Sequence, residues 1–150
     1  MSLLKWSALL LPMSPFIKAI PQYLNSIAMA KSDFVQQLQA LGYYAQELAV
    51  QGRIFQVFDY QVPVGRFAGQ TVRLGLEVRE SFPMDAPPGP HFAPHLLGIN
   101  TGGVHPVGGI HNSPLGAEWQ YWSRPFSEWA QTDKTARIYL AHIKHLLDTV

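Results

Sequence analysis

The apolar positions of the chain first repeat at helical spacing in the stretch that follows Lys31. This spacing predicts an amphipathic helix with one face toward a core. Ser32 or Asp33 can cap the helix, because a short side-chain oxygen accepts a hydrogen bond from a free amide of the first turn. Gly52 marks the end that we expect for it. The apolar stripe consists of Phe34, Leu38, Leu41, Ala45 and Leu48.

Two β-strands follow in the pattern. Residues 53–62 are rich in aromatic and β-branched side chains, which favour strands, and Pro63-Val64-Gly65 after them is typical of a turn. Residues 71–78 alternate between apolar and other side chains, as a half-buried antiparallel strand does. Residues 90–97 are expected to add a short third strand, at an edge of the sheet because proline donates no hydrogen bond to a central ladder.

Between Phe82 and Trp129, proline and glycine interrupt every periodic pattern, so we expect no helix or strand of ordinary length there. Three of the four tryptophans nevertheless lie in this stretch, and a disordered segment cannot bury such large apolar side chains. The stretch is therefore predicted to be an ordered, functional loop. Trp119, Trp122 and Trp129 are expected to anchor it to the core. Arg124 is expected to pair with a carboxylate or a backbone carbonyl.

A second helical pattern closes the chain. Thr132 or Asp133 can cap it, and Lys144 and His145 place positive charge near its end, where the helix dipole favours it. Strands grouped between two helices predict an α+β fold, with an antiparallel meander and the helices on one face of the sheet. The apolar stripe of this last helix consists of Ala136, Tyr139, Leu140, Ile143, Leu146 and Leu147.

The composition narrows the class of protein. The 150 residues suffice for one domain with its own core, which we expect at residues 31–150. A formal net charge of +1 without a basic run gives no sign of nucleic-acid binding. Cysteine is absent from the sequence, which excludes disulfides and thiolate chemistry and fits a reducing compartment, so we expect a cytoplasmic protein. No cofactor is expected.

Residues 1–30 form an apolar N-terminal extension whose role the sequence leaves open. Pro12, Pro15 and Pro21 interrupt it, so we expect no membrane-spanning helix there. Three alternatives remain: a helical extension that packs on the domain, a signal peptide cleaved after Ala28-Met29-Ala30, and sequence upstream of a start at Met29.

Several short motifs follow one another between the predicted strands and the last helix. They are Phe82-Pro83, Pro87-Pro88, His105-Pro106, Gly108-Gly109-Ile110-His111 and Trp119. In this order they resemble the ubiquitin-conjugating enzymes, where an aromatic-proline step, a double proline, a His-Pro-Asn, a Gly-x-Ile-Cys and a tryptophan succeed one another. A bacterial branch of that superfamily, associated with ubiquitin-like conjugation gene clusters, is closer still. The motifs that resemble this branch are Trp119…Trp122-Ser123-Arg124…Trp129 and Val62-Pro63-Val64-Gly65.

The resemblance implies a ubiquitin-conjugating-enzyme-like fold, in which His111 takes the position of the catalytic cysteine. Val107 stands where the family motif has the asparagine that stabilises the oxyanion. We therefore expect a cysteine-less variant, a pseudoenzyme that binds a ubiquitin-like modifier or its activating enzyme, and we weigh it ahead of an unusual enzyme. The resemblance implies that the contacts to this partner come from Gly108, Gly109, Ile110, Trp122 and Arg124.

The first alternative is an active acyl carrier. His111 can form a labile acyl-imidazole, and Ser113 a stable ester if His111 or His105 serves as its base. Asn112 or Asn100 is then the candidate oxyanion donor.

Two further alternatives are a generic interaction domain of the related RWD type and a zinc site. Zinc needs three or four converging ligands, and the sequence lacks a recognised spacing such as His-Glu-x-x-His. We therefore rank the zinc site last and expect no metal. Its ligands would have to come from His91, His95, His105, His111, His142 and His145.

Overall fold

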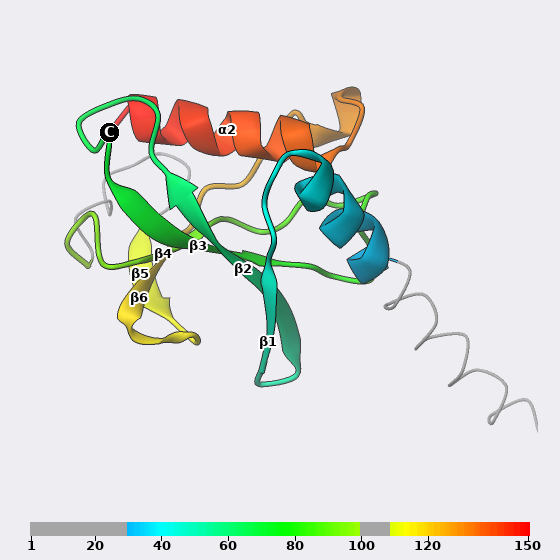
Figure 1. The fold of residues 1–150 in the computed structure, drawn as a ribbon, viewed down its shortest axis with the longest axis horizontal. Helices are drawn as coiled ribbons and strands as arrows, with labels where there is room; N and C mark the ends of the chain where they lie inside the picture. The colour runs from blue at the N-terminus through cyan, green and yellow to red at the C-terminus, as the bar shows by residue number, and fades with distance from the viewer. Residues whose placement is uncertain (1–29, 100–108) are drawn as a thin grey trace, which may run out of the picture.

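The computed structural model describes residues 30–99 and 109–150 (Figure 1). Within these ranges the chain forms a six-stranded sheet and two α-helices, one over residues 30–40 and the other α2 (Ala136–Asp148). A short 3-10 helix, η2 (Trp129–Gln131), precedes α2. Neither of the two α-helices is long and apolar enough, over these residues, to cross a membrane. The predicted α+β class is confirmed.

Six strands form the sheet, with the bounds β1 (Gln46–Val50), β2 (Arg53–Gln61), β3 (Thr71–Glu77), β4 (His91–Ala93), β5 (Ile110–Ser113) and β6 (Gly116–Trp122). Their order in space is β1-β2-β3-β4-β6-β5, and all neighbours are antiparallel. The first four strands form a meander, of which β2, β3 and β4 correspond to predicted strands and β1 does not. The β5–β6 hairpin joins it through β6, so β5 lies at one end of this sheet and β1 at the other.

The first helix is shorter than the sequence predicts. It ends at residue 40, and Gly42 follows with a φ of 91°, a left-handed conformation that commonly terminates a helix. The amide of Tyr43 donates to the carbonyl of Leu38 across this end. The prediction of a helix to Gly52 is wrong, because the residues of β1 pair with β2 and Gly52 lies in the turn between them with a φ of 74°.

Both predicted helix caps are also wrong. Residue 30 is already helical, so Ser32 and Asp33 lie inside the first helix, where they accept hydrogen bonds from glutamines one turn later. The N-cap of α2 is Thr135, whose side chain accepts a hydrogen bond from the amide of Ile138 at 3.3 Å. The predicted apolar stripe of α2 is confirmed, since all six of its residues are buried.

The stretch from Phe82 to Trp129 contains a hairpin that the sequence pattern does not predict. β6 has seven residues and pairs with both β4 and β5. The prediction of no strand of ordinary length is therefore wrong for this part. β4 is not an edge strand either, since it lies between β3 and β6. Its prolines, Pro90 and Pro94, flank the three paired residues instead of lying among them, so they remove no hydrogen bond from the ladder.

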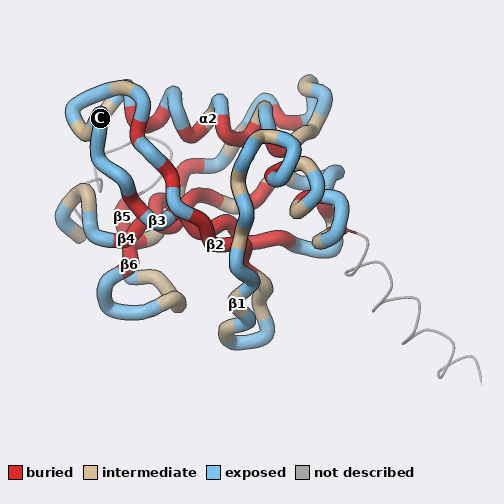
Figure 2. The backbone as a smooth tube through the Cα atoms, viewed as in Figure 1, coloured by how far each residue is buried: buried red, intermediate tan, exposed pale blue. Residues whose placement is uncertain are grey.

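Two apolar clusters lie on opposite faces of the sheet, because successive side chains of β2 alternate between them. The main core contains residues of both helices, together with Phe58 and Tyr60 of β2. The small core consists of Phe55, Val57, Ala93 and Trp119. Figure 2 shows the buried segments running along the central strands and the inner side of α2. Both helices therefore cover one face, as predicted.

Candidate functional site

β5 carries the two predicted nucleophile candidates, His111 and Ser113. His111 is exposed and Ser113 is half-buried. Between them Asn112 is exposed, and Ile110 before them is buried in the main core. Because side chains alternate along a strand, Asn112 points away from His111 and the structure does not bring these two together. His105 and Gly108, like Asn100, lie outside the described residues.

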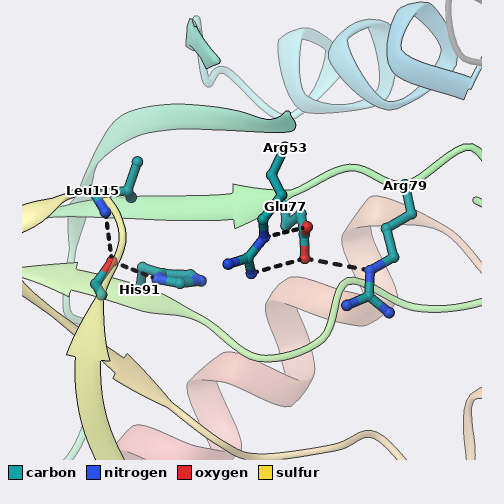
Figure 3. Close-up of polar contacts among 6 residues, drawn as sticks. Arg53, Glu77, Arg79, His91 and Leu115 are labelled. Atoms are coloured by element: carbon teal, nitrogen blue, oxygen red, sulfur yellow. Dashed lines mark hydrogen bonds and ion pairs between the residues drawn. The ribbon is translucent and has the colours of Figure 1, made fainter. Parts of the chain in front are cut away.

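Ser113 forms a hydrogen bond with a histidine that the sequence does not pair with it. Its Oγ lies 2.8 Å from Nδ1 of His91, and the amide of Leu115 donates to the same Oγ at 3.1 Å (Figure 3). We assign the hydroxyl proton of Ser113 to the bond with Nδ1, which takes His91 in its Nε2–H tautomer. His91 then carries its proton on Nε2, which is buried without a hydrogen-bond partner among the described residues.

Aromatic rings hold His91 in place within a row of residues that crosses the sheet. Its ring stacks on Tyr121 with centroids 4.7 Å apart, and Phe55 contacts it edge-on at 5.0 Å. Tyr121 also pairs with His111 in the ladder, and the centroids of these two rings lie 6.2 Å apart. Gly75 is directly opposite His91 in the ladder, and a Cβ there would lie 2.9 Å from a methyl carbon of Leu115. The absence of that Cβ leaves the space into which the hairpin turn packs.

An ion-pair cluster centred on the buried Glu77 lies beside His91. Nε of Arg53 donates to Glu77 at 2.7 Å, and Nε of Arg79 donates to the same carboxylate at 3.3 Å (Figure 3). Burial alone would raise the pKa of Glu77, but the hydrogen bonds and charges of the two arginines outweigh it and hold that pKa below its ordinary value. Burial lowers the pKa of His91 to about 4, and the Arg53 charge adds to this while Glu77 opposes it. His91 is therefore neutral at pH 7.

The predicted tryptophan anchors are confirmed, because Trp119, Trp122 and Trp129 are all buried. Arg124 is buried too, and its Nη1 donates to the carbonyl of Ser123 at 3.0 Å and, more weakly, to that of Gly109 at 3.4 Å. The prediction that Arg124 meets a backbone carbonyl is confirmed.

Three of the residues predicted to contact a partner are almost fully buried. The side chains of Ile110, Trp122 and Arg124 are exposed by 2% or less, whereas Gly109 is half-buried. In this conformation the three side chains position β5 and β6 and do not present a surface of their own. Direct contact with a partner would have to come from the exposed residues beside them, such as His111.

Gln120 is a buried residue that the sequence analysis misses. Its Oε1 accepts hydrogen bonds from the amides of Leu96 and Leu97 and from the indole of Trp122, and its Nε2 donates to the carbonyl of Leu97. One side-chain amide thus fixes the segment that follows β4. A glutamine between aromatic residues gives no sequence signal for this role.

The structure gives no support to the zinc alternative over the residues that it describes. In residues 30–99 and 109–150, no three histidine, aspartate or glutamate side chains converge in a way that could hold a metal ion. His142 stacks on Phe126 with ring centroids 4.4 Å apart, and its Nε2 lies 3.3 Å from the carbonyl oxygen of Arg124. His105, one of the proposed ligands, lies outside these ranges.

The sequence presents His91 only as a possible zinc ligand and gives no sign of its bond to Ser113. The available signal is its place in the predicted strand at residues 90–97. That signal does not reveal its neighbours, because β4 reaches Ser113 and Tyr121 through pairing with β6, which is distant in the chain.

Comparison with known protein families identifies the family of the chain. The model of the family described as Prokaryotic E2 family E matches residues 31–150. No curated protein and no solved structure matches the chain. The family match spans both helices and all six strands of the described sheet.

Proposed function

The chain belongs to prokaryotic E2 family E, and from this we propose that it is a cysteine-less member that recognises a ubiquitin-like modifier or its activating enzyme in a bacterial conjugation pathway. The observation that carries the proposal is the E2-family match over residues 31–150 in a chain without cysteine. A thioester needs a thiol, so this chain cannot hold the modifier as a thioester of its own. Recognition of the modifier or of its activating enzyme needs no thiol, so the chain can retain it. We propose the cytoplasm as its compartment and residues 31–150 as its domain.

The position of β5 supports this proposal. Among the described residues β5 pairs with β6 alone, and a strand at the end of a sheet can add an extended peptide through main-chain hydrogen bonds. The C-terminal tail of a ubiquitin-like modifier is such a peptide. The exposed His111, which the sequence resemblance puts at the position of the family's catalytic cysteine, lies within this strand. We infer that the tail binds alongside β5.

Binding is tested directly by calorimetric titration of the purified chain. The titrants are a ubiquitin-like protein encoded beside its gene, and that protein's activating enzyme with ATP. We expect a measurable Kd for at least one of them and no reductant-sensitive adduct on denaturing gels. Failure to bind every modifier and activating enzyme tested would instead favour the RWD-type interaction domain.

A pair of charge variants tests the role of β5. His111→Glu adds a negative charge on β5, and Gln46→Glu adds the same charge at an exposed position of β1, the opposite end of the sheet. A modifier tail ends in a carboxylate, so His111→Glu should weaken binding about tenfold, or about 1.4 kcal/mol, and Gln46→Glu should leave it unchanged. Equal affinities for both variants would contradict binding at β5.

His111→Cys tests the alignment with the family's cysteine. If His111 stands at the nucleophile position, the new thiol should accept a modifier from the charged activating enzyme and give an adduct that reducing agents remove. Wild type and His111→Ser are the controls. A folded His111→Cys protein that binds the charged enzyme and forms no such adduct would show that another residue occupies that position.

A further inference from the structure

We propose that Ser113 is an acyl-accepting residue with His91 as its base, and that its substrate is a carboxyl group activated as a thioester. This goes beyond recognition of a partner. It rests on the proposed function in one respect, that the charged activating enzyme is the natural source of the thioester.

The geometry prepares the hydroxyl for loss of its proton. The amide of Leu115 donates to Oγ of Ser113 at 3.1 Å, and Nδ1 of His91 lies 2.8 Å from the same oxygen. One group therefore stabilises negative charge on the oxygen while the other accepts its proton, which is the arrangement that activates a serine. Ser127 offers a comparison within the same chain, since it is exposed and no histidine bonds to it among the described residues.

The base is held rigidly. Tyr121 stacks on the ring of His91, Phe55 packs against its edge, and the residue is only 1% exposed. The imidazole therefore has little freedom to turn its Nδ1 away from Ser113. Ser113 itself is half-buried, so a small acyl group can reach it while His91 stays covered.

The reaction that we propose is a single acyl transfer. Oγ of Ser113 attacks the thioester carbonyl carbon, a C–O bond forms and the C–S bond breaks. The proton of Oγ passes to Nδ1 of His91 and from there to the departing thiolate, so that the products are a serine ester and a free thiol. No oxidant or further reactant is needed.

The environment of His91 favours a lasting ester over turnover. His91 is only 1% exposed, so water reaches its Nδ1 poorly once Ser113 is acylated. The acyl group on Ser113 also stands between Nδ1 and the solvent. We therefore expect stoichiometric acylation with slow hydrolysis.

The test uses the acetyl thioester of N-acetylcysteamine, so that it depends on no protein partner. After incubation with wild-type chain, peptide mass spectrometry measures acetylation at each site. We expect acetyl-Ser113 that resists neutral hydroxylamine, with Ser127 unmodified. Ser113→Ala should remove the modification, and urea-unfolded chain should show none at Ser113. Acetylation confined to lysines or to His111 in the folded chain would overturn the proposal.

The role of His91 is tested by variants and by pH. His91→Gln should slow acetylation of Ser113 by tenfold or more, whereas His145→Ala, at an exposed position of α2, should leave its rate unchanged. With wild type, the rate should be flat from about pH 5.5 to about pH 8, because His91 stays deprotonated over this range, whereas an exposed histidine base gives a rise near pH 6.5. Such a rise, or an unchanged rate in folded His91→Gln, would overturn His91 as the base.

The outcomes separate the two proposals. Acetyl-Ser113 without any modifier binding leaves the acyl acceptor in place and removes the proposed function. Binding without acetylation does the reverse.

Discussion

The two faces of the sheet are built from different kinds of side chain. The face under the helices is covered by a large apolar cluster that includes Phe34, Trp122 and Ile143. The opposite face has a small apolar cluster, and beside it lie the buried His91 and Glu77. Apolar packing stabilises without needing partners, whereas each buried polar group needs a hydrogen bond or a counter-ion. The helix face therefore supplies most of the stability, and the opposite face supplies the groups that can do chemistry.

The largest effect that distinguishes the faces should come from truncation of a tryptophan. Trp122→Ala removes a fully buried side chain from the main core and should lower the free energy of unfolding by about 3–5 kcal/mol. Trp119→Ala empties a site in the small core, which has fewer neighbours to lose, and should cost about 3 kcal/mol or less. Urea unfolding followed by circular dichroism measures both. If Trp119→Ala lowers the free energy of unfolding more than Trp122→Ala does, the helix face does not supply most of the stability.

Acid should lower the free energy of unfolding by protonating His91 and Glu77, on the face of the sheet opposite the helices. The pKa of His91 is lowered from 6.5 to about 4 on folding, so the unfolded chain takes up a proton first as pH falls. Stability present above pH 6.5 is therefore lost between pH 6.5 and about 4, by up to about 3 kcal/mol. Glu77, whose folded pKa is depressed, adds a loss at still lower pH, as pH falls through that folded value.

The variant His91→Gln provides the control for the acid effect. It lacks the titrating ring, so its free energy of unfolding should change less between pH 7 and about 4 than that of wild type. Urea midpoints at matched pH values measure the difference. If the free energy of unfolding changes equally with pH in the two proteins, His91 is not the group responsible.

A smaller effect is expected at Gly75, which lies in the ladder opposite His91. In Gly75→Ala the new methyl group would lie 2.9 Å from a side-chain carbon of Leu115 and 3.3 Å from the ring of Trp119. The Leu115 side chain can move, so the cost should be about 1–2 kcal/mol. Because Leu115 also donates to Ser113, this variant should slow acetylation of Ser113. Unchanged stability and unchanged acetylation together would show that the hairpin turn packs loosely on this face.

The smallest effect concerns the helix face alone. Thr135→Ala removes the N-cap of α2 and should cost about 1 kcal/mol, whereas Asp133→Ala, at a position that the sequence favours as a cap, should cost little. Thermal unfolding of the two variants decides between the two caps. A greater loss of stability in Asp133→Ala than in Thr135→Ala would show that Asp133 is the N-cap, as the sequence predicts.

The elements predicted correctly from the sequence are those whose signal is local. The stripe of α2 repeats along one segment, and the alternation in residues 71–78 marks β3, so both can be read without knowing the rest of the chain. The end of the first helix is missed because the stripe of apolar residues continues past Gly42 into β1, where Leu48 packs on the small core.

The candidate site could be predicted only in part. The motif order indicates the family and draws attention to His111 and Ser113, both of which lie on β5. The pairing of Ser113 with His91 depends on β6 lying between β4 and β5. A strand register of this kind is set by contacts between distant segments, and no spacing in the sequence encodes it.

The place of β5 at the end of the sheet has a consequence for local opening. The central strands have a neighbour on each side, whereas β5 pairs, among the described residues, with β6 alone and is held further by the packing of Ile110 and by the bond from Ser113 to His91. Segments with fewer such contacts open at lower free-energy cost than the whole molecule unfolds. The amide protons of β5 should therefore exchange with solvent before those of β3. The strand that carries His111 and Ser113 is thus expected to open before the central strands of the sheet do.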